Sequence, residues 1–440
     1  MFLNNKIRDL LNISFVRDVG ILQIGTIIST ALALVASVVF ARILGAENYG
    51  IYSLIFAFTG LVGIFQNIGS ERTCLTLLPE AYAKKDKQEI KNILTYFVKV
   101  TFLITITVGL IAIIFAPFFS DLLYHNSEIG KLARWILLAN IFGSFFILLT
   151  LSLQSVRKIK YLSIIEVINK SFYKLFPILF IILGLGILGI VWGYLLSSIL
   201  FLFFSFFIYR KLAQRNEYFP GFRQVVLNFN KINFKKYFNF GFLIAIDNNL
   251  GNFAGLLPVV FLGIFALPQE VAYFKIAFAY ITIPSLLTSS ISRMLTVQLP
   301  KSKTYSLQIL KQHFFKTSLY SGLISVLLVI PFVVLAPYLI NLFYGKEFLP
   351  SIFLVYYLAI LVAISGFSVG LGPIYRTLNK MKITIILNII QIIFMVLLML
   401  LLIRIFNSLE SIVFVMIITS FVFTLLNFYI INTFFKKTLN

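Results

Sequence analysis

The sequence is poor in charged residues, and poorest in acidic ones. Only 12% of its 440 residues are charged, with 15 Asp and Glu against 37 Lys and Arg, whereas 60% are hydrophobic and the mean hydropathy is +0.99. About a quarter of the residues in a soluble domain are charged. The composition therefore excludes an ordinary soluble domain and indicates a polytopic membrane protein.

Cysteine and histidine are almost absent. Cys74 is the single cysteine, so no intramolecular disulfide can form, and His125 and His313 fall in different predicted loops. The sequence shows no cluster with the spacing of a metal site and no Walker A segment that would cradle the phosphates of ATP. We expect no cofactor, no metal site and no direct use of ATP.

Long apolar segments dominate what is present. Twelve of them can cross about 30 Å of hydrocarbon at about 1.5 Å per residue. They are predicted at residues 19–44, 49–68, 93–116, 135–156, 161–184, 185–209, 238–265, 271–297, 315–336, 351–374, 383–405 and 411–434. The predicted fold class is an all-α integral membrane protein with about 12 transmembrane helices.

The chain also contains an internal repeat. Residues 116–124 and 336–344 share a pattern at an offset of 220, and residues 40–53 and 261–274 share a weaker one at an offset of 221. We expect two six-helix bundles, residues 1–215 and 238–440, joined by a basic cytoplasmic linker at residues 216–237. Six spans return the chain to its starting side, so the two copies should be parallel repeats.

Lys and Arg gather on one predicted side of the membrane. Of the 37, 28 lie on the side of both termini, 5 lie on the opposite side and four lie within spans. This bias predicts a multi-pass protein of the cell (inner) membrane with both termini in the cytoplasm. It also explains the net charge of +22 by topology and by attraction to membrane lipids, so no nucleic-acid partner is expected.

Three short motifs carry a family resemblance: ARILG at 41–45, YGIYSL at 49–54 and LFYGKEFLP at 342–350. They resemble the oligosaccharide flippases, the polysaccharide-biosynthesis (O-antigen) transporters of the multidrug/oligosaccharidyl-lipid/polysaccharide exporter superfamily. The resemblance implies a multidrug-exporter-like fold that moves a polyprenyl-diphosphate-linked oligosaccharide from the cytoplasmic to the external leaflet. The product would serve O-antigen (lipopolysaccharide), capsule or similar synthesis, with other polysaccharide-assembly proteins as partners.

Charged side chains inside the predicted spans are candidates for function, because each costs about 2.5 to 3.5 kcal/mol to insert. Glu166, Lys170 and Lys174 are spaced by four residues and share one helix face, with Lys170 about 14 Å into the bilayer. Alternatively, Glu166 and Lys170 form a structural ion pair, and the Lys174 side chain extends its ammonium to the membrane–water interface.

Other spans supply further charges. Asp247 lies at a similar depth in the seventh span, followed by two asparagines. A diphosphate needs cations, and we expect four to bind it: Lys170, Lys174, Lys275 and Arg42. Two carboxylates, Asp247 and Glu166, are expected to couple transport to an ion gradient. Arg42 is alternatively an anchor at the membrane interface.

Two other functions compete with the flippase. A cation-coupled multidrug exporter of the same superfamily would have a cavity in which carboxylates are the main charged groups. The predicted spans instead hold more lysines than carboxylates. A membrane enzyme of glycan assembly would need catalytic residues or a large domain outside, and the predicted outer loops are short. We therefore expect no catalytic residues and a transporter that works by alternating access.

Cysteines placed at positions 170 and 174 should react with a small charged thiol reagent, because both positions are predicted to line a cavity open to water. Protection of both cysteines in the inward-open state would instead place these side chains against lipid or in a packed core.

Overall fold

The computed structural model describes residues 14–439, apart from the side chains of residues 14–19, 22, 240, 243–244, 287, 289–290 and 439. Within this range the chain is helical and contains no strand. Nine stretches of the described chain are long and apolar enough to cross a membrane: Gln23–Gln66, Lys87–Tyr124, Ser127–Ser155, Ile159–Arg215, Ala245–Phe265, Leu307–Tyr344, Ser351–Thr377, Met381–Leu402 and Ser408–Thr438. The prediction of an all-α integral membrane protein is confirmed.

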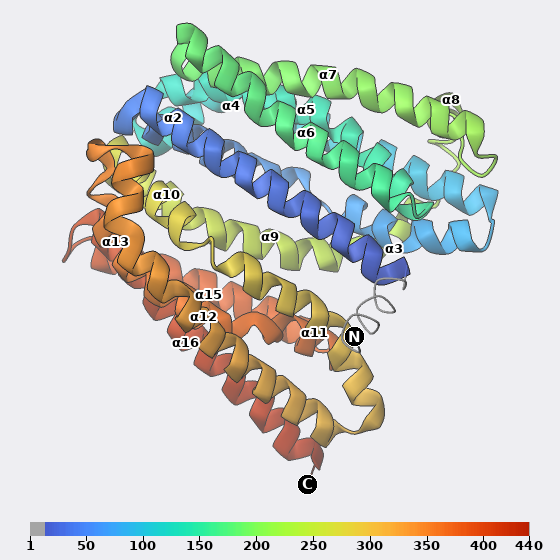
Figure 1. The fold of residues 1–440 in the computed structure, drawn as a ribbon. Coiled ribbons are helices and arrows are strands. Elements are labelled where there is room, and N and C mark those ends of the chain that lie inside the picture. The colour runs from blue at the N-terminus through green and yellow to red at the C-terminus, as the bar shows by residue number, and fades with distance from the viewer. Residues whose placement is uncertain (1–13, 440) are drawn as a thin grey trace, which may run out of the picture. The chain divides into compact units, whose positions relative to one another are not determined.

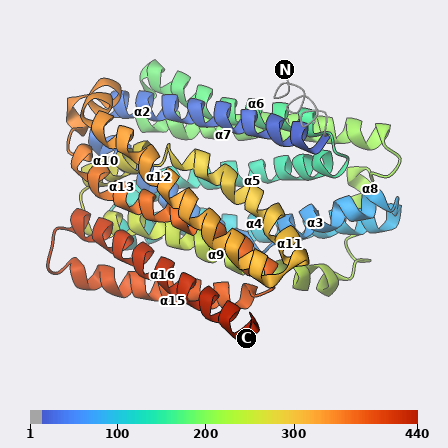
Figure 2. The ribbon, with the colours of Figure 1, turned by 60° about the horizontal axis from the view of Figure 1, so that its bottom comes forward.

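Two of these stretches each hold two predicted spans. Helix α2 (Ser14–Gln66) is interrupted at Gly45, where φ is 72° and ψ is 175°. Helices α6 (Ile159–Phe180) and α7 (Gly186–Arg215) meet through a single π-turn at Ile181–Leu185, with φ of 85° at Gly184 and 53° at Gly186. Glycine adopts positive φ without the strain that a Cβ would bring. The chain therefore reverses with almost no loop, as predicted, and α6 and α7 lie side by side (Figures 1 and 2).

The chain forms two compact units. Unit 1 contains the residues up to Leu44 and Phe58–Asn249, and unit 2 contains Gly45–Ala57 and the residues from Leu250. Helix α2 and helix α9 (Phe234–Phe265) therefore each contribute to both units. The division into bundles of residues 1–215 and 238–440 stays a prediction.

Unit 1 has an apolar core near its polar connectors. It is built from α3 (Ser70–Ala83), α4 (Lys87–Tyr124), α5 (Ser127–Ser155), α6, α7, the short α8 (Phe222–Leu227) and the start of α9. Cys74 lies fully buried in this core, and burial raises the pKa of its thiol above the ordinary value. The single thiol is thus an inert packing group.

The basic connector at residues 216–237 is packed onto unit 1. Val225 and Tyr237 are buried in its core, and Asn228 donates hydrogen bonds to Asn92 Oδ1 at 3.0 Å and Thr95 Oγ1 at 3.3 Å. The Lys99 ammonium donates to the Phe229 carbonyl at 2.8 Å. The connector is therefore a structured part of unit 1.

Unit 2 is built from a second set of helices. It contains α10 (Pro268–Ile281), α11 (Ser285–Tyr305), α12 (Leu307–Tyr344), α13 (Ser351–Phe367), α14 (Leu371–Thr377), α15 (Met381–Leu402) and α16 (Ser408–Leu439), with short 3₁₀ turns η2 (Lys346–Phe348) and η3 (Ser368–Gly370). Helix α13 packs against α10, α12 and α16, and α15 lies beside α16 (Figure 2). The apolar core of this unit joins α11, α12, α14, α15 and α16.

The sequence repeat corresponds to a repeated helix. Helices α4 and α12 both have 38 residues, and both carry a proline seven residues before their last residue. Each begins after a capping side chain, Asp86 or Ser306, that accepts a hydrogen bond from the backbone N–H three residues on. The offset of 220 thus relates two helices with the same bounds and the same cap.

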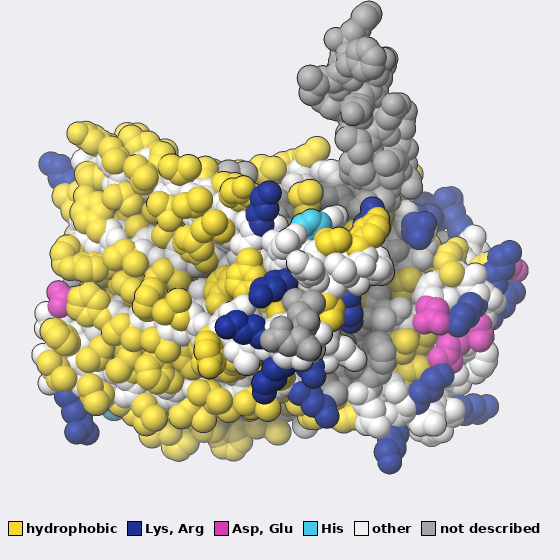
Figure 3. All heavy atoms as spheres, turned by 90° about the horizontal axis from the view of Figure 1, so that it is seen from below, with side chains coloured by type: hydrophobic (Ala, Val, Ile, Leu, Met, Phe, Trp, Pro, Cys, Tyr) yellow, Lys and Arg dark blue, Asp and Glu magenta, His cyan; other side chains and the backbone are white. Residues whose placement is uncertain are grey.

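Many large hydrophobic side chains are exposed, as expected of a surface in contact with lipid. On α12 they recur every four residues at Leu319, Leu323 and Leu327, with exposed fractions of 53%, 49% and 66%. Figure 3 shows yellow side chains over much of the left part of the view, with charged side chains at its left margin and toward the centre.

Gly45–Ala57 is held in unit 2 by the 342–350 motif. The Ala46 N–H donates to Glu347 Oε1 at 2.8 Å, so this carboxylate caps the helix that resumes after Gly45. Tyr49 and Tyr273 both meet Phe348 edge to face, at centroid distances of 6.3 Å and 6.4 Å. A Cβ at residue 50 would collide with the carbonyl of Pro268, so only glycine fits there. Two of the motifs that carry the family resemblance therefore meet at one end of unit 2.

Glu347→Ala should lower the free energy of unfolding by about 1 kcal/mol, because the Ala46 N–H loses its acceptor. Thermal unfolding of the protein in detergent should show a Tm lower by about 1 to 2 °C. Glu347→Gln keeps an acceptor oxygen, so its Tm should fall less than that of Glu347→Ala. Lys346→Ala, at the exposed neighbouring residue, is the control. Equal Tm values for Glu347→Ala and Lys346→Ala would contradict the cap.

Candidate functional site

The predicted lysines of α6 differ in their surroundings. Lys174 is half-buried, and its ammonium donates to the Tyr194 hydroxyl at 3.1 Å and lies 5.6 Å from the centre of that ring. Tyr194 comes from α7, whose close pairing with α6 follows from the tight turn at Gly184. A tyrosine thus stabilises the cation by a hydrogen bond and by its ring face.

Glu166 and Lys170 occupy the same helix as Lys174. Lys170 is exposed and Glu166 is half-buried. Among the described residues, neither makes a contact short enough for a salt bridge. The ion pair considered for these two residues is therefore not formed in this conformation.

Asp247 lies half-buried in the part of α9 that belongs to unit 1. Two residues on, the Asn249 amide donates to the carbonyls of Ile64 at 3.1 Å and Asn67 at 2.7 Å. These carbonyls lie at the end of α2, where the last acceptors of a helix lack a full set of helical partners; the Ile64 carbonyl also accepts from the Asn67 N–H at 3.3 Å. The Asn249 Oδ1 is buried and has no partner among the described residues. Asp247 therefore lies two residues before a buried, unsatisfied acceptor in α9.

The remaining predicted cations lie elsewhere. Arg42 is exposed near the end of the first part of α2, in unit 1, and Lys275 is half-buried in α10, in unit 2. The structure thus gathers Glu166, Lys170 and Lys174 on one helix. The roles assigned to the six predicted site residues stay predictions.

Two helices of unit 2 are broken where continuous spans were predicted. The eighth predicted span divides into α10 and α11 around Thr282–Pro284, and the tenth divides into α13 and α14 at the 3₁₀ turn η3. Pro284 and Pro373 explain the breaks, because proline lacks an N–H and its ring clashes with the preceding helical turn. Irregular backbone is tolerated at membrane depth only against protein or a water-filled cavity.

A polar cavity of about 500 Å³ lies between the broken helices. One wall is a face of α11 with four hydroxyl groups, and the other is formed by α13, η3 and α14. The lining hydroxyls belong to Ser285, Thr288, Ser292, Thr296, Ser365 and Ser368. Four of them already donate to a backbone carbonyl three or four residues back in the sequence, which leaves oxygen lone pairs for a ligand. The cavity is therefore rich in hydrogen-bonding groups that carry no charge.

Arg376 is the cationic residue that lines the cavity. Its guanidinium is exposed and forms no ion pair with a described residue, and no described lining residue is acidic. Its short helix is fixed from two sides. The Tyr375 hydroxyl donates to Asn427 Oδ1 at 2.9 Å, and the Lys303 ammonium donates to the Thr377 carbonyl at 3.0 Å. This cavity, with hydroxyls and one guanidinium, suits a polyhydroxylated or anionic ligand.

Sequence reasoning did not identify this cavity. Two signals were available: the spacing of Ser285, Thr288, Ser292 and Thr296 along one helical face, and the glycines before Pro373. The pairing of Lys174 with Tyr194 was missed as well, since it requires the rotation of two neighbouring helices to be known.

Comparisons with known proteins agree with this architecture. The profile of a family described as "Polysaccharide biosynthesis protein" matches residues 15–300. No curated protein sequence matches the chain.

Several solved transporters share the fold. An inward-facing multidrug resistance MATE family transporter of the MOP superfamily is similar, with a TM-score of 0.72 and 14% identity over 93% of this chain and 96% of that one. The lipid II flippase MurJ in an inward closed conformation has a TM-score of 0.68 and 16% identity over 93% of this chain and 87% of that one. The eukaryotic MATE transporter AtDTX14 has a TM-score of 0.65 and 16% identity over 95% and 96%. At these identities the likeness concerns the fold.

Proposed function

The chain belongs to the polysaccharide biosynthesis protein family, and from this premise we propose that it flips a polyprenyl-diphosphate-linked oligosaccharide from the cytoplasmic to the external leaflet. The glycan would feed synthesis of a cell-surface polysaccharide such as O-antigen or capsule. The observation that carries the proposal is the cavity of hydroxyls and Arg376 between two broken helices of unit 2. Secondary transporters commonly place their substrate sites at discontinuous helices.

The chemistry of the cavity matches that of the substrate. Hydroxyl groups donate to and accept from sugar hydroxyls, and a guanidinium binds a phosphate oxygen with two parallel hydrogen bonds. We assign Arg376 to an anionic group near the reducing end of the glycan. Four further cations are proposed to contact the diphosphate during transport: Lys170, Lys174, Lys275 and Arg42.

The proposal includes an orientation and a transport cycle. The excess of Lys and Arg on one side supports a protein of the inner membrane with both termini in the cytoplasm. In that orientation Arg376 lies toward the cytoplasmic side, where the substrate is loaded. We propose alternating access between the bundles of residues 1–215 and 238–440, driven by an ion gradient through Asp247 and Glu166.

The lining of the cavity favours a flippase over the two alternatives. A multidrug exporter for cationic compounds calls for a carboxylate at its site, and no described residue that lines this cavity is acidic. A catalytic role has no positive support, since the family profile and the similar structures describe polysaccharide biosynthesis and transport.

Purified protein in liposomes should expose a fluorescent lipid-linked oligosaccharide at the outer leaflet faster than protein-free liposomes, as measured with a membrane-impermeant quencher. Arg376→Gln should slow exposure by about ten- to a hundredfold, because a hydrogen bond to a charged group contributes about 1.5 to 3 kcal/mol. Arg376→Lys keeps the positive charge but cannot form two parallel hydrogen bonds. Its rate of exposure should therefore fall between those of the wild type and Arg376→Gln.

The exposed Arg404→Gln, in the turn after α15, is the matched control and should transport like the wild type. If wild-type liposomes behave like protein-free ones, the proposed function is wrong. If the wild type transports and Arg376→Gln equals it, the function stands and the assignment of Arg376 is wrong.

Asp247→Asn should reduce transport while leaving abundance in the membrane near normal, because it removes a titratable charge but keeps size and hydrogen bonding. The dependence of transport on pH and sodium should also weaken, since a carboxylate can bind a proton or a cation at different stages of the cycle.

Asp121→Asn, at an exposed carboxylate near the end of α4, is the control for removal of a negative charge. Full transport by Asp247→Asn with unchanged dependence on pH and sodium would show that Asp247 has only a structural role.

A further inference from the structure

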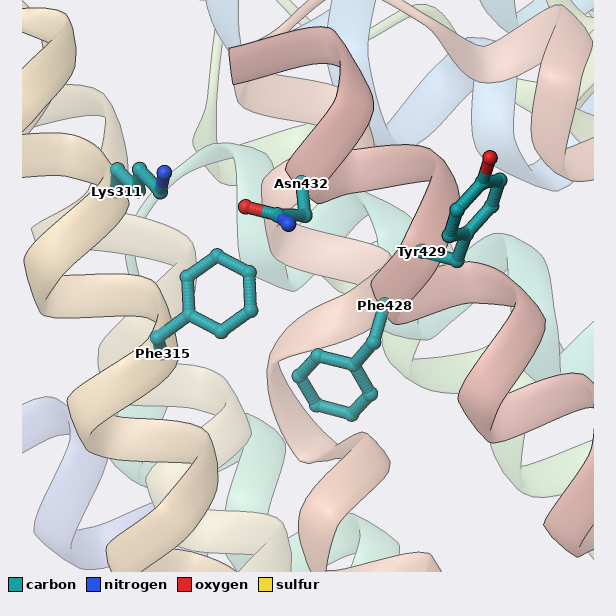
Figure 4. A pocket seen from close by; sticks show the side chains of 5 residues that line it. All are labelled: Lys311, Phe315, Phe428, Tyr429 and Asn432. Atoms are coloured by element: carbon teal, nitrogen blue, oxygen red, sulfur yellow. The ribbon is translucent and has the colours of Figure 1, made fainter. Parts of the chain in front are cut away.

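A second pocket, of about 340 Å³, opens between α12 and α16 in unit 2. Its lining residues are Lys311, Phe315, Phe428, Tyr429 and Asn432. Figure 4 shows the Lys311 ammonium pointing toward the Asn432 carboxamide, with the rings of Phe315 and Phe428 on the same side of both. The pocket thus combines two polar groups with an aromatic wall, and it does not overlap the cavity around Arg376.

The polar groups of this pocket are available to a ligand. Neither Lys311 nor Asn432 makes a side-chain hydrogen bond or ion pair with a described residue, whereas the Lys316 ammonium on the same helix lies 5.8 Å from the ring centre of Tyr320. Residues 301–345 and 411–440 contain no Asp or Glu. Glu410, in the first turn of α16, lies 22 residues before Asn432, at the other end of that helix. The counter-ion of Lys311 must therefore come from outside these two segments.

The aromatic wall is a fixed surface. The ring of Phe428 lies 5.8 Å from that of Phe315 and 5.6 Å from that of the fully buried Phe314, measured between centroids. Tyr429, at the outer edge, is 70% exposed. Tyrosine in such a position is typical of the interface between hydrocarbon and head groups.

An apolar stripe leads away from the pocket along both helices. On α12, Lys311 and Phe315 continue at intervals of four into the exposed Leu319, Leu323 and Leu327, which places all five on one ridge. On α16, Phe421 and Leu425 are 53% and 54% exposed. From Lys311 to Leu323 the ridge runs about 18 Å, close to the roughly 15 Å of hydrocarbon in one leaflet. The surface therefore matches an amphiphile with an anionic head.

We propose that this pocket binds one anionic phospholipid of the cytoplasmic leaflet. Its phosphate accepts hydrogen bonds from the Lys311 ammonium and the Asn432 amide, and its chains lie along the apolar stripe. The volume suits a single head group rather than an oligosaccharide. The excess of Lys and Arg on the side where α12 begins identifies the leaflet.

Native mass spectrometry of the full-length protein in detergent, titrated with phosphatidylglycerol or phosphatidylcholine, tests the proposal. The wild type should bind one phosphatidylglycerol at least tenfold more tightly than phosphatidylcholine. Lys311→Gln should lose this preference, and Asn432→Leu should weaken it several-fold. Lys316→Gln, on the same helix, should bind like the wild type.

Each remaining outcome decides against the proposal. Equal phosphatidylglycerol binding by Lys311→Gln and the wild type would exclude the pocket as the site. Displacement of the lipid by millimolar inorganic phosphate would identify a site for free anions, and tighter binding of a polyprenyl phosphate would identify a site for the carrier lipid. Thermal unfolding of each variant establishes that binding is measured on folded protein.

Discussion

Backbone hydrogen bonding without water is the constraint on which the structure depends. Inside hydrocarbon every N–H and C=O group needs a partner within the protein, so the described chain is helical and its loops are short. The tight turn at Gly184 and the interruption at Gly45 occur at helix ends, where few groups need new partners. The breaks at Pro284 and at η3 occur within predicted spans, and both border the polar cavity. Irregular backbone therefore marks the place where polar ligands can be accommodated.

The same scarcity of water governs the polar side chains. Lys174 obtains a hydroxyl and a ring face from Tyr194, and the Asn249 amide satisfies carbonyls at the end of α2. Lys311 and Arg376 differ, because each borders a pocket and has no ion-pair partner among the described residues. In both proposals this cation binds an anionic ligand.

Hydropathy and length predicted the helical fold and the two adjacent spans that meet at Gly184. A residue pattern shared at an offset of 220 predicted the repeat that relates α4 to α12. They did not predict the divisions of the eighth and tenth spans, because a hydropathy window averages over Pro284 and over the glycines before Pro373. Contacts such as that between Lys174 and Tyr194 could not be predicted from the sequence either. A span that is apolar all round gives no period from which to read the direction of its faces, so contacts between helices stayed undetermined until the structure placed them.

The exchange of segments between the two units has a consequence for the integrity of the chain. Gly45–Ala57 comes from the first half of the sequence and belongs to unit 2, whereas the first part of α9 belongs to unit 1, so the backbone passes between units at three points. A single cut after α7 would leave unit 2 without the segment that Glu347 caps and unit 1 without Asn249 at the end of α2. Gene fission at the midpoint would therefore yield two polypeptides that each complete their packing only in the presence of the other.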